Sequence, residues 1–189
     1  MVARRSIAGV VAVLLALCMA PAMADDTEAW QALKDGRAVL MLRHALAPGT
    51  GDPTGFDLED CSTQRNLNER GREQARAWKE LLASHGIDRA RVYTSQWCRC
   101  RDTAEEMDVG PVTEWPPLNS FFGGQGDGDQ QTRQTIAAVN ALEDGPPVIL
   151  VSHQVNVTRL TGIYPSSNEG VILSRPLSQS PTVFARVSP

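Results

Sequence analysis

The stretch VLMLRHALAPG, residues 39 to 49, decides the fold because a short apolar run ends on two strongly hydrated side chains, Arg43 and His44. A short continuous run of apolar residues is typical of a strand that is covered on both faces of a sheet. In open α/β sheets, ligands bind in the crevice outside the carboxyl ends of the strands. The stretch therefore predicts a buried strand over residues 38–43 that carries Arg43 and His44 to a binding site.

The rest of the chain alternates strands with helices. Apolar runs predict further strands at residues 90–95 and 147–152, and at a sheet edge 170–174 and 182–187. Amphipathic patterns predict helices over residues 69–84, 98–107 and 130–142. Asn68 is placed to cap the first of these helices and Gly86 to end it. This alternation predicts an α/β protein, a three-layer α/β/α sandwich with a mainly parallel central sheet.

Residues 116–132, PPLNSFFGGQGDGDQQT, form a Gly-rich, acidic segment without periodicity. Such a segment is typical of a flexible connector or of a lid over a site. Both interpretations stay open at this point.

Residues 1–24 have the pattern of a secretory signal peptide. Arg4 and Arg5 precede an apolar run from Ile7 to Ala20, and Ala22-Met23-Ala24 supplies a small-residue cleavage site. The apolar run is short for an uncleaved anchor, since a membrane-spanning helix needs about 20 residues, and lipid attachment at Cys18 would follow the bulky Leu17. We expect residues 25–189 to form one periplasmic or secreted domain, with no membrane span after cleavage.

The charge of the chain limits its partners. It carries 18 Lys and Arg against 22 Asp and Glu, a formal net charge of −4 that becomes more negative once Arg4 and Arg5 leave with the signal peptide. Such a surface disfavours nucleic acid, so a small anionic ligand must be held by a local cluster of cations. We expect a monomer or a weak dimer that needs no cofactor.

Three cysteines follow the signal peptide: Cys61, Cys98 and Cys100. An odd number in an exported protein suggests one disulfide and one thiol. A bridge between Cys98 and Cys100 is geometrically awkward. Pairing of Cys61 with Cys98 is the first choice and of Cys61 with Cys100 the second. The cysteines lack the paired spacing of a zinc site, so no metal is expected.

Polar side chains follow three of the predicted strands. Arg43 and His44 follow the first strand, Ser95 follows the second, and His153 comes directly after Ser152 at the end of residues 147–152. The carboxyl ends of parallel strands share one edge of the sheet, so these groups are expected to converge. Ser95, Arg99 and Thr103 are spaced by four and share a helix face, which favours Arg99 for the site and leaves Arg101 at the surface.

Four segments resemble the motifs of the histidine phosphatase superfamily, which has the phosphoglycerate mutase-like fold. LRHALA resembles its Arg-His-Gly signature, and SQWCRCRDTA resembles its Ser-x3-Arg-x3-Thr-Ala segment. VILVSHQ resembles the strand that bears the second histidine, and RNLNERGREQA resembles its Leu-x3-Gly-x2-Gln-Ala stretch. The resemblance covers residues 37–187 and keeps the order of the motifs. It implies the same fold for residues 25–189.

The resemblance also implies roles for individual residues. His44 would attack phosphorus as a neutral imidazole and form a phosphohistidine. Arg43 and Arg99 would hold the phosphoryl oxygens with their planar guanidinium groups, and His153 would add a further donor. Ser95 and Ala45 would belong to the substrate-binding set, with Ala45 standing where the family has Gly.

The resemblance leaves the proton donor for the leaving group unassigned. Asn119 stands near the place where many members have Glu, and Gln154 follows His153 where another branch has Asp. The candidates that remain in this sequence are Asp127, Asp129 and Glu169.

The expected function is that of an exported phosphatase that hydrolyses a small phosphomonoester, such as an envelope or sugar phosphate, through a phosphohistidine intermediate. Three alternatives stay open: a phosphotransferase or mutase, a catalytically inactive phosphate-binding module, and a hydrolase that uses Cys98 or Cys100 with His153.

Overall fold

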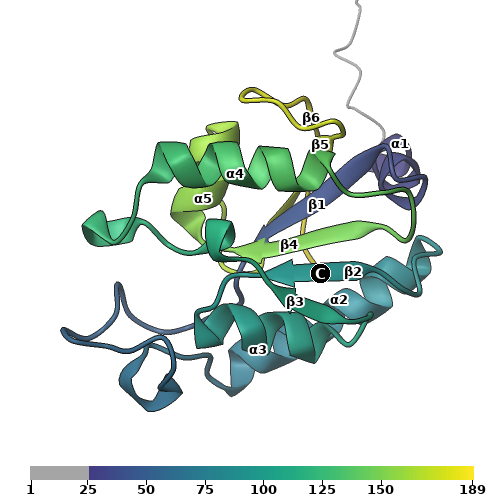
Figure 1. Cartoon of the computed structure of the whole chain (residues 1–189). Helices are drawn as coiled ribbons and strands as arrows, with labels where there is room; N and C mark the ends of the chain where they lie inside the picture. Colours follow the sequence, from purple (N-terminus) through teal and green to yellow (C-terminus); the bar gives the residue numbers. More distant parts are fainter. Residues whose placement is uncertain (1–25) are drawn as a thin grey trace, which may run out of the picture.

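The apolar runs form one sheet. Within residues 26–189, the part of the chain that the computed structural model describes, the strands are β1 (Ala38–Arg43), β2 (Arg91–Thr94), β3 (Val112–Glu114), β4 (Val148–Ser152), β5 (Gly170–Ser174) and β6 (Val183–Val187). They pair in the order β3-β2-β4-β1-β5-β6. The carboxyl ends of β1, β2 and β4 therefore lie next to one another (Figure 1).

The sheet is mainly parallel, as predicted. β1, β2, β3 and β4 pair in parallel, whereas β5 pairs antiparallel with both β1 and β6. The expectation that both C-terminal strands lie at the edge is wrong for β5, which lies between β1 and β6. Its apolar residues Val171, Ile172 and Leu173 are fully buried, and β6 alone forms this edge.

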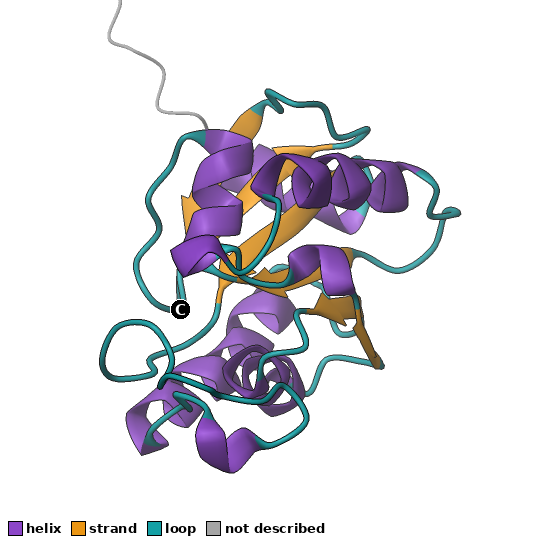
Figure 2. Ribbon diagram, turned by 60° about the vertical axis from the view of Figure 1, so that its left-hand side comes forward, coloured by secondary structure: helices purple, strands orange, loops and turns teal. Residues whose placement is uncertain are grey.

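Helices cover both faces of the sheet. Leu40 and Leu42 of β1 pack in one core with α1 (Asp26–Lys34), α2 (Glu69–Ser84) and α3 (Cys98–Met107). Val39 and Met41 pack in a second core with α4 (Gly128–Asn140) and α5 (Gln154–Thr161). Successive side chains of a strand point to opposite faces, so one apolar run supplies both cores. The two helical layers around the sheet confirm the three-layer sandwich (Figure 2).

Helices α2 and α3 have the predicted bounds. The side chain of Asn68 accepts a hydrogen bond from the backbone N of Gly71 at 2.9 Å and so caps α2. Gly71 also lets the helix approach the strand, because a Cβ atom there would lie 2.2 Å from the carbonyl oxygen of Leu46. After α2 the chain turns at Gly86, which has a φ of 71°. This packing brings the first turn of α2 against the segment that follows β1.

The segment 116–132 is more ordered than a flexible connector. It contains the short helices η2 (Pro116–Leu118) and η3 (Phe122–Gly124), and α4 begins at Gly128 instead of residue 130. The earlier start has a local cause, since the carboxylate of Asp127 accepts hydrogen bonds from the backbone N of Asp129 and of Gln130, both at 3.0 Å. Three further short elements, α1, β3 and α5, leave no clear pattern in the sequence and were not predicted.

A disulfide joins Cys61 to Cys98, the first of the two predicted pairings. Cys61 lies in η1 (Cys61–Thr63), within the long segment between β1 and α2, and Cys98 is the first residue of α3. Arg101 contacts both sulfur atoms, at 3.1 and 3.2 Å, and pairs with Glu114 on the outside of α3. The disulfide therefore ties the segment after β1 to the start of α3.

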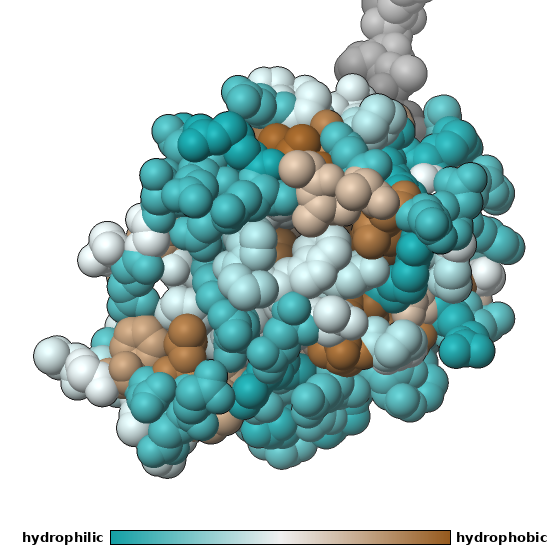
Figure 3. Space-filling model, viewed as in Figure 1, coloured by the Kyte–Doolittle hydropathy of each residue, from teal (hydrophilic) through white to brown (hydrophobic). Residues whose placement is uncertain are grey.

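The predicted signal peptide, residues 1–24, lies outside the described residues. Among residues 26–189 no helix has the length and apolar character that crossing a membrane requires. On the face seen in Figure 3, apolar side chains form small, separate patches among hydrophilic ones. Most of the large apolar residues lie in the two cores instead.

Removing the disulfide is expected to lower the free energy of unfolding by roughly 3 to 4 kcal/mol, because the unfolded chain gains the freedom of a closed loop. The sequence separation of the two cysteines is 37 residues. The double variant Cys61→Ser/Cys98→Ser, compared with the wild type by urea unfolding, measures this loss. Arg101→Ala, which removes a contact to both sulfur atoms but keeps the bond, is the control. Thiol titration of the unfolded, non-reduced chain from residue 25 onward should find one thiol, and finding three would contradict the disulfide.

Candidate active site

His44 lies at the end of β1, held by two backbone hydrogen bonds. Its backbone N donates to the carbonyl oxygen of Ser152 at 2.9 Å, which continues the pairing of β1 with β4. Its ring Nδ1 lies 2.8 Å from the carbonyl oxygen of Ala45. A carbonyl accepts only, so Nδ1 carries the proton and the lone pair of a neutral ring lies on Nε2. Nε2 is thus the ring nitrogen that carries no proton.

Two physical effects keep this imidazole neutral. His44 is 2% exposed, and its burial lowers its pKa well below the usual value of 6.5. The guanidinium charges of Arg99, Arg65 and Arg43 lower the pKa of His44 further. At neutral pH Nε2 therefore carries no proton, and its lone pair accepts a hydrogen bond from Nε of Arg99.

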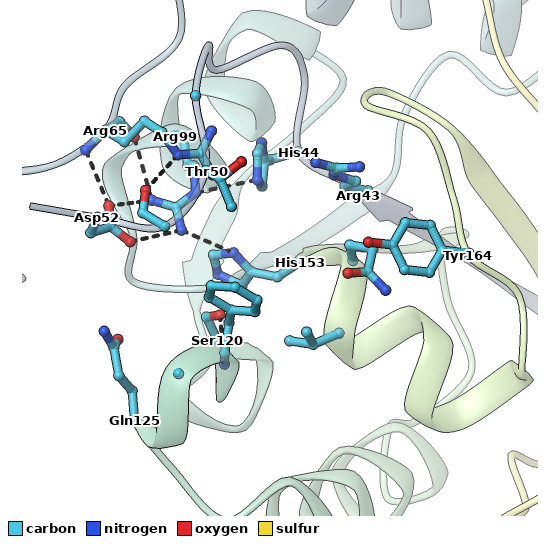
Figure 4. A pocket seen from close by; sticks show the side chains of 16 residues that line it. Arg43, His44, Thr50, Asp52, Arg65, Arg99, Ser120, Gln125, His153 and Tyr164 are labelled. Carbon is cyan, nitrogen blue, oxygen red and sulfur yellow. Dashed lines mark hydrogen bonds and ion pairs between the residues drawn. The ribbon is translucent and has the colours of Figure 1, made fainter.

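Arg99 reaches the site from the first turn of α3. Its Nε lies 3.2 Å from His44 Nε2, and its Nη2 lies 3.5 Å from Nδ1 of His153. The other edge of the guanidinium group pairs with Asp52, through Nη1 to Oδ1 at 2.8 Å and Nη2 to Oδ2 at 3.1 Å. The side edge of Arg99, formed by Nε and Nη2, therefore faces both imidazoles (Figure 4).

His153 follows β4 and stands beside His44, with the ring centroids 5.5 Å apart. Its Nε2 lies 2.8 Å from the hydroxyl of Ser95, and it is 3% exposed. Burial lowers the pKa of His153 well below 6.5, as does the charge of Arg99. The two neutral imidazoles thus share one wall of the site.

A cavity of about 320 Å³ opens onto these groups. Arg43, Arg65 and Arg99 line it together with His44 and His153, so three guanidinium groups from three segments converge (Figure 4). Arg43 donates to the carbonyl oxygen of Pro165, but its Nε is buried and unpaired within residues 26–189. Burial lowers the pKa of Arg65 to about 10, with a contribution from the charge of Arg99, yet Arg65 still stays charged at neutral pH. Such a cavity attracts an oxyanion.

Not every predicted site residue lies in the cavity. The four residues at its base do: Arg43, His44, Arg99 and His153. Ser95 and Ala45, expected to bind substrate, are fully buried beneath its lining. Ser95 instead bonds to His153, and the backbone of Ala45 bonds to His44 and to the hydroxyl of Thr103. Ser95 and Ala45 therefore contact the two histidines and do not line the cavity themselves.

The three candidate proton donors also lie outside the cavity lining. Asp127 caps α4, Asp129 pairs with Arg159, and Glu169 pairs with Arg186. Asn119, near the place expected for an acid, accepts hydrogen bonds from the Ser95 hydroxyl and the backbone N of Gln96. Each of these side chains already has a structural partner.

Neither cysteine of the cysteine-hydrolase alternative is suited to act as the nucleophile. Cys98 forms the disulfide. Cys100 is buried 3.5 Å from His153 Nε2, and burial raises the pKa of its thiol to about 12. The thiol is therefore protonated at neutral pH and is a poor nucleophile.

Several residues of the cavity were not predicted from the sequence: Thr50, Asp52, Arg65, Ser120, Phe122, Gln125, Gln154 and Tyr164. Thr50, Asp52 and Arg65 belong to the segment directly after the first motif, where ligand-binding loops are expected. Arg65 also begins the quoted RNLNERGREQA motif. The remaining ones lie in the 116–132 segment and around α5, where only the possible lid function pointed to a site.

The buried imidazoles should make stability depend on pH. Their pKa values are lowered in the folded protein, so below about pH 6.5 the unfolded chain takes up protons that the folded chain refuses. The free energy of unfolding should fall by about 1 kcal/mol per imidazole for each pH unit below this value. Urea unfolding at pH 7.5, 6.5 and 5.5 tests this. The variant His44→Asn should show a shallower slope, and an unchanged stability of the wild type across this range would refute the assignment.

Solved structures similar to this chain share its fold. The protein histidine phosphatase SixA, complexed with tungstate, has a TM-score of 0.58 at 21% identity, over 80% of this chain and 97% of that one. A mycobacterial glucosyl-3-phosphoglycerate phosphatase, complexed with VO3, has a TM-score of 0.52 at 18% identity, over 73% and 91%. Phosphoserine phosphatase from Entamoeba histolytica has a TM-score of 0.53 at 12% identity, over 80% and 97%.

The sequence comparisons agree with the structural ones. No curated protein matches the chain in a sequence search. The sequence profile of the histidine phosphatase superfamily (branch 1) matches residues 39–143, more than half of the chain and a range that includes His44, Asp52, Arg65 and Arg99. The chain thus belongs to the histidine phosphatase superfamily and is a histidine-dependent phosphatase.

Proposed function

We propose that this phosphatase is exported and hydrolyses a small phosphomonoester through a phosphohistidine at His44. One observation carries the proposal: the Nε2 lone pair of a neutral, buried His44 opens onto a cavity that three guanidinium groups line. A phosphoryl group bound there would place its phosphorus in front of Nε2 and its oxygens against cations.

The transfer proceeds in two displacements at phosphorus. In the first, the Nε2 lone pair of His44 forms a bond to phosphorus while the bond from phosphorus to the ester oxygen breaks. The leaving oxygen keeps the electron pair and takes a proton from water. In the second, water attacks the phosphohistidine, the N–P bond breaks, the lone pair returns to His44, and a proton of the attacking water passes to the hydroxide that the first step left. Arg43 and Arg99 neutralise the charge on the phosphoryl oxygens in both steps.

The described residues that line the cavity offer the leaving group no carboxylic acid. Among the described residues that line it, Asp52 is the one carboxylate. Burial works against ionisation of Asp52, but the hydrogen bonds and charge of Arg99 outweigh it and lower the pKa. Asp52 is therefore ionised and no proton donor. The enzyme therefore takes this proton from water.

The mouth of the cavity favours an uncharged sugar as the leaving group. Phe122 is 50% exposed and Tyr164 is 72% exposed, and these are two of the three large apolar side chains that are exposed in residues 26–189. Both line the cavity, beside Thr50 and Gln125, whose side chains make no hydrogen bond in this range. Aromatic faces can pack on a sugar ring while amides and hydroxyls bind its OH groups. An envelope sugar phosphate fits this mouth.

Two independent features, the signal pattern and the disulfide, support the proposed export. Residues 1–24 have the signal pattern. The Cys61–Cys98 disulfide suits an oxidising compartment. Together they support a periplasmic or secreted location.

The phosphohistidine is tested by trapping. An aryl phosphate labelled with ³²P is the substrate, because a phenolate leaves without an acid. After a quench in base, the label should stay on the wild-type protein and should be lost in acid. His44→Ala should carry no label and lose more than about 10³-fold in kcat.

Paired arginine variants give the control for this test. Arg99→Ala should lose on the order of 10²-fold in kcat/KM, whereas Arg101→Ala, on the outside of the same helix, should keep activity within about twofold. Turnover by His44→Ala at the wild-type rate would refute the mechanism. A wild type that binds vanadate and hydrolyses no ester would establish the phosphate-binding module instead, which the missing proton donor favours.

The sugar preference is tested at the mouth. Phe122→Ala and Tyr164→Ala should each raise KM for a hexose phosphate about two- to tenfold and leave KM for glycerol phosphate unchanged, since an aromatic contact contributes roughly 0.5 to 1.5 kcal/mol. Steady-state phosphate release measures both. Val183→Ala, at the third exposed apolar residue, is the matched control. An equal rise of KM for both substrates would contradict ring recognition.

A further inference from the structure

Asp52 is buried in the wall of the cavity although its segment lies at the surface. Its side chain is 4% exposed and faces the guanidinium group of Arg99, which is 3% exposed. Oδ1 accepts from Arg99 Nη1 at 2.8 Å and from the backbone N of Arg65 at 3.1 Å. Oδ2 accepts from Arg99 Nη2 at 3.1 Å and from Trp97 Nε1 at 3.0 Å. Four donors thus fix both the position and the plane of this carboxylate.

A carboxylate fixed in this way also fixes the arginine. A guanidinium group is planar, so pairing its Nη1–Nη2 edge with Asp52 leaves the Nε–Nη2 edge facing away from Asp52. That second edge is the one beside His44 Nε2 and His153 Nδ1. Arg99 consequently meets a bound phosphoryl group with the two N–H donors of its Nε–Nη2 edge, while Asp52 occupies its Nη1–Nη2 edge.

Asp52 also changes the charge of the cavity. Three guanidinium groups line it, and Asp52 is the opposing charge among the described lining residues. The ionised groups thus sum to two positive charges, which matches the two negative charges of a phosphomonoester. Without Asp52 the cavity would hold any anion, including the product phosphate, more tightly.

We propose that Asp52 is a positioning residue, which turns the Nε–Nη2 edge of Arg99 toward the phosphoryl group and limits the retention of phosphate. This inference rests on the proposed function, because it assigns Asp52 an effect on transfer to His44. It predicts that loss of the carboxylate slows turnover and yet strengthens binding of the product.

The test compares three variants with p-nitrophenyl phosphate as substrate and inorganic phosphate as competitive inhibitor. Asp52→Asn should lower kcat by about ten- to a hundredfold, because a small misplacement of a transfer group has this effect. Its inhibition constant for phosphate should fall several-fold. Trp97→Phe keeps the ion pair but removes one of the four donors, so it should lower kcat by several-fold with an unchanged inhibition constant. Asp102→Asn, which breaks an Arg–Asp pair on the outer side of the same helix, should change neither.

The two variants near the site keep the test decisive. If Asp52→Asn does not fold, Trp97→Phe decides, because it leaves no buried charge unpaired. For Asp52→Asn, a loss of kcat together with tighter phosphate binding supports the proposal. For Trp97→Phe, a loss of kcat with an unchanged inhibition constant supports it. An unchanged kcat, or a loss of kcat with a proportional loss of phosphate binding, overturns it. A wild type without any hydrolysis overturns the proposed function first, and the role of Asp52 with it.

Discussion

The repulsion among three guanidinium groups around a desolvated imidazole is the constraint on which the site depends. Like charges this close disfavour one another unless other groups hold them. Arg43 donates to the carbonyl oxygen of Pro165, Arg65 to those of Gly51 and Ala47, and Arg99 to Asp52. The chain thus holds its cations with backbone oxygens and one carboxylate. Burial, together with the remaining positive charge, keeps His44 neutral. A phosphoryl dianion is the partner that relieves this repulsion.

The fold supplies the positions for this cluster. Parallel pairing of β1 with β4 puts Arg43 opposite Ser152, so that His44 and His153 leave the sheet side by side. The segment between β1 and α2 has few regular elements, and the disulfide from Cys61 to Cys98 fastens it to the helix that bears Arg99. The ion pair of Asp52 with Arg99 joins the same two segments. A covalent bond and an ion pair together hold one wall of the cavity.

The sheet, its two helical layers and the residues at the base of the cavity could be predicted from the sequence, because buried strands and amphipathic helices leave strong periodic signals. Sequence reasoning placed Arg43, His44, Arg99 and His153 at one edge since strand ends share that edge. It did not find Asp52, whose segment has no periodicity and whose partner lies 47 residues away in the chain. The burial of Ser95 and Ala45 outside the cavity lining was not foreseen, because it follows from packing that no local pattern reports. The acidic candidates remain predictions, although Asp127 caps α4 and Glu169 pairs with Arg186, 17 residues away in the chain.

A crystal structure of the protein with vanadate, which mimics a phosphoryl group in transfer, tests the central claim most directly. The account predicts vanadium bonded to Nε2 of His44, with its oxygens on Arg43 and on the Nε–Nη2 edge of Arg99, and with the pair of Asp52 and Arg99 intact. Vanadate bound away from His44, or bound in place of Asp52 on the Nη1–Nη2 edge of Arg99, would contradict it.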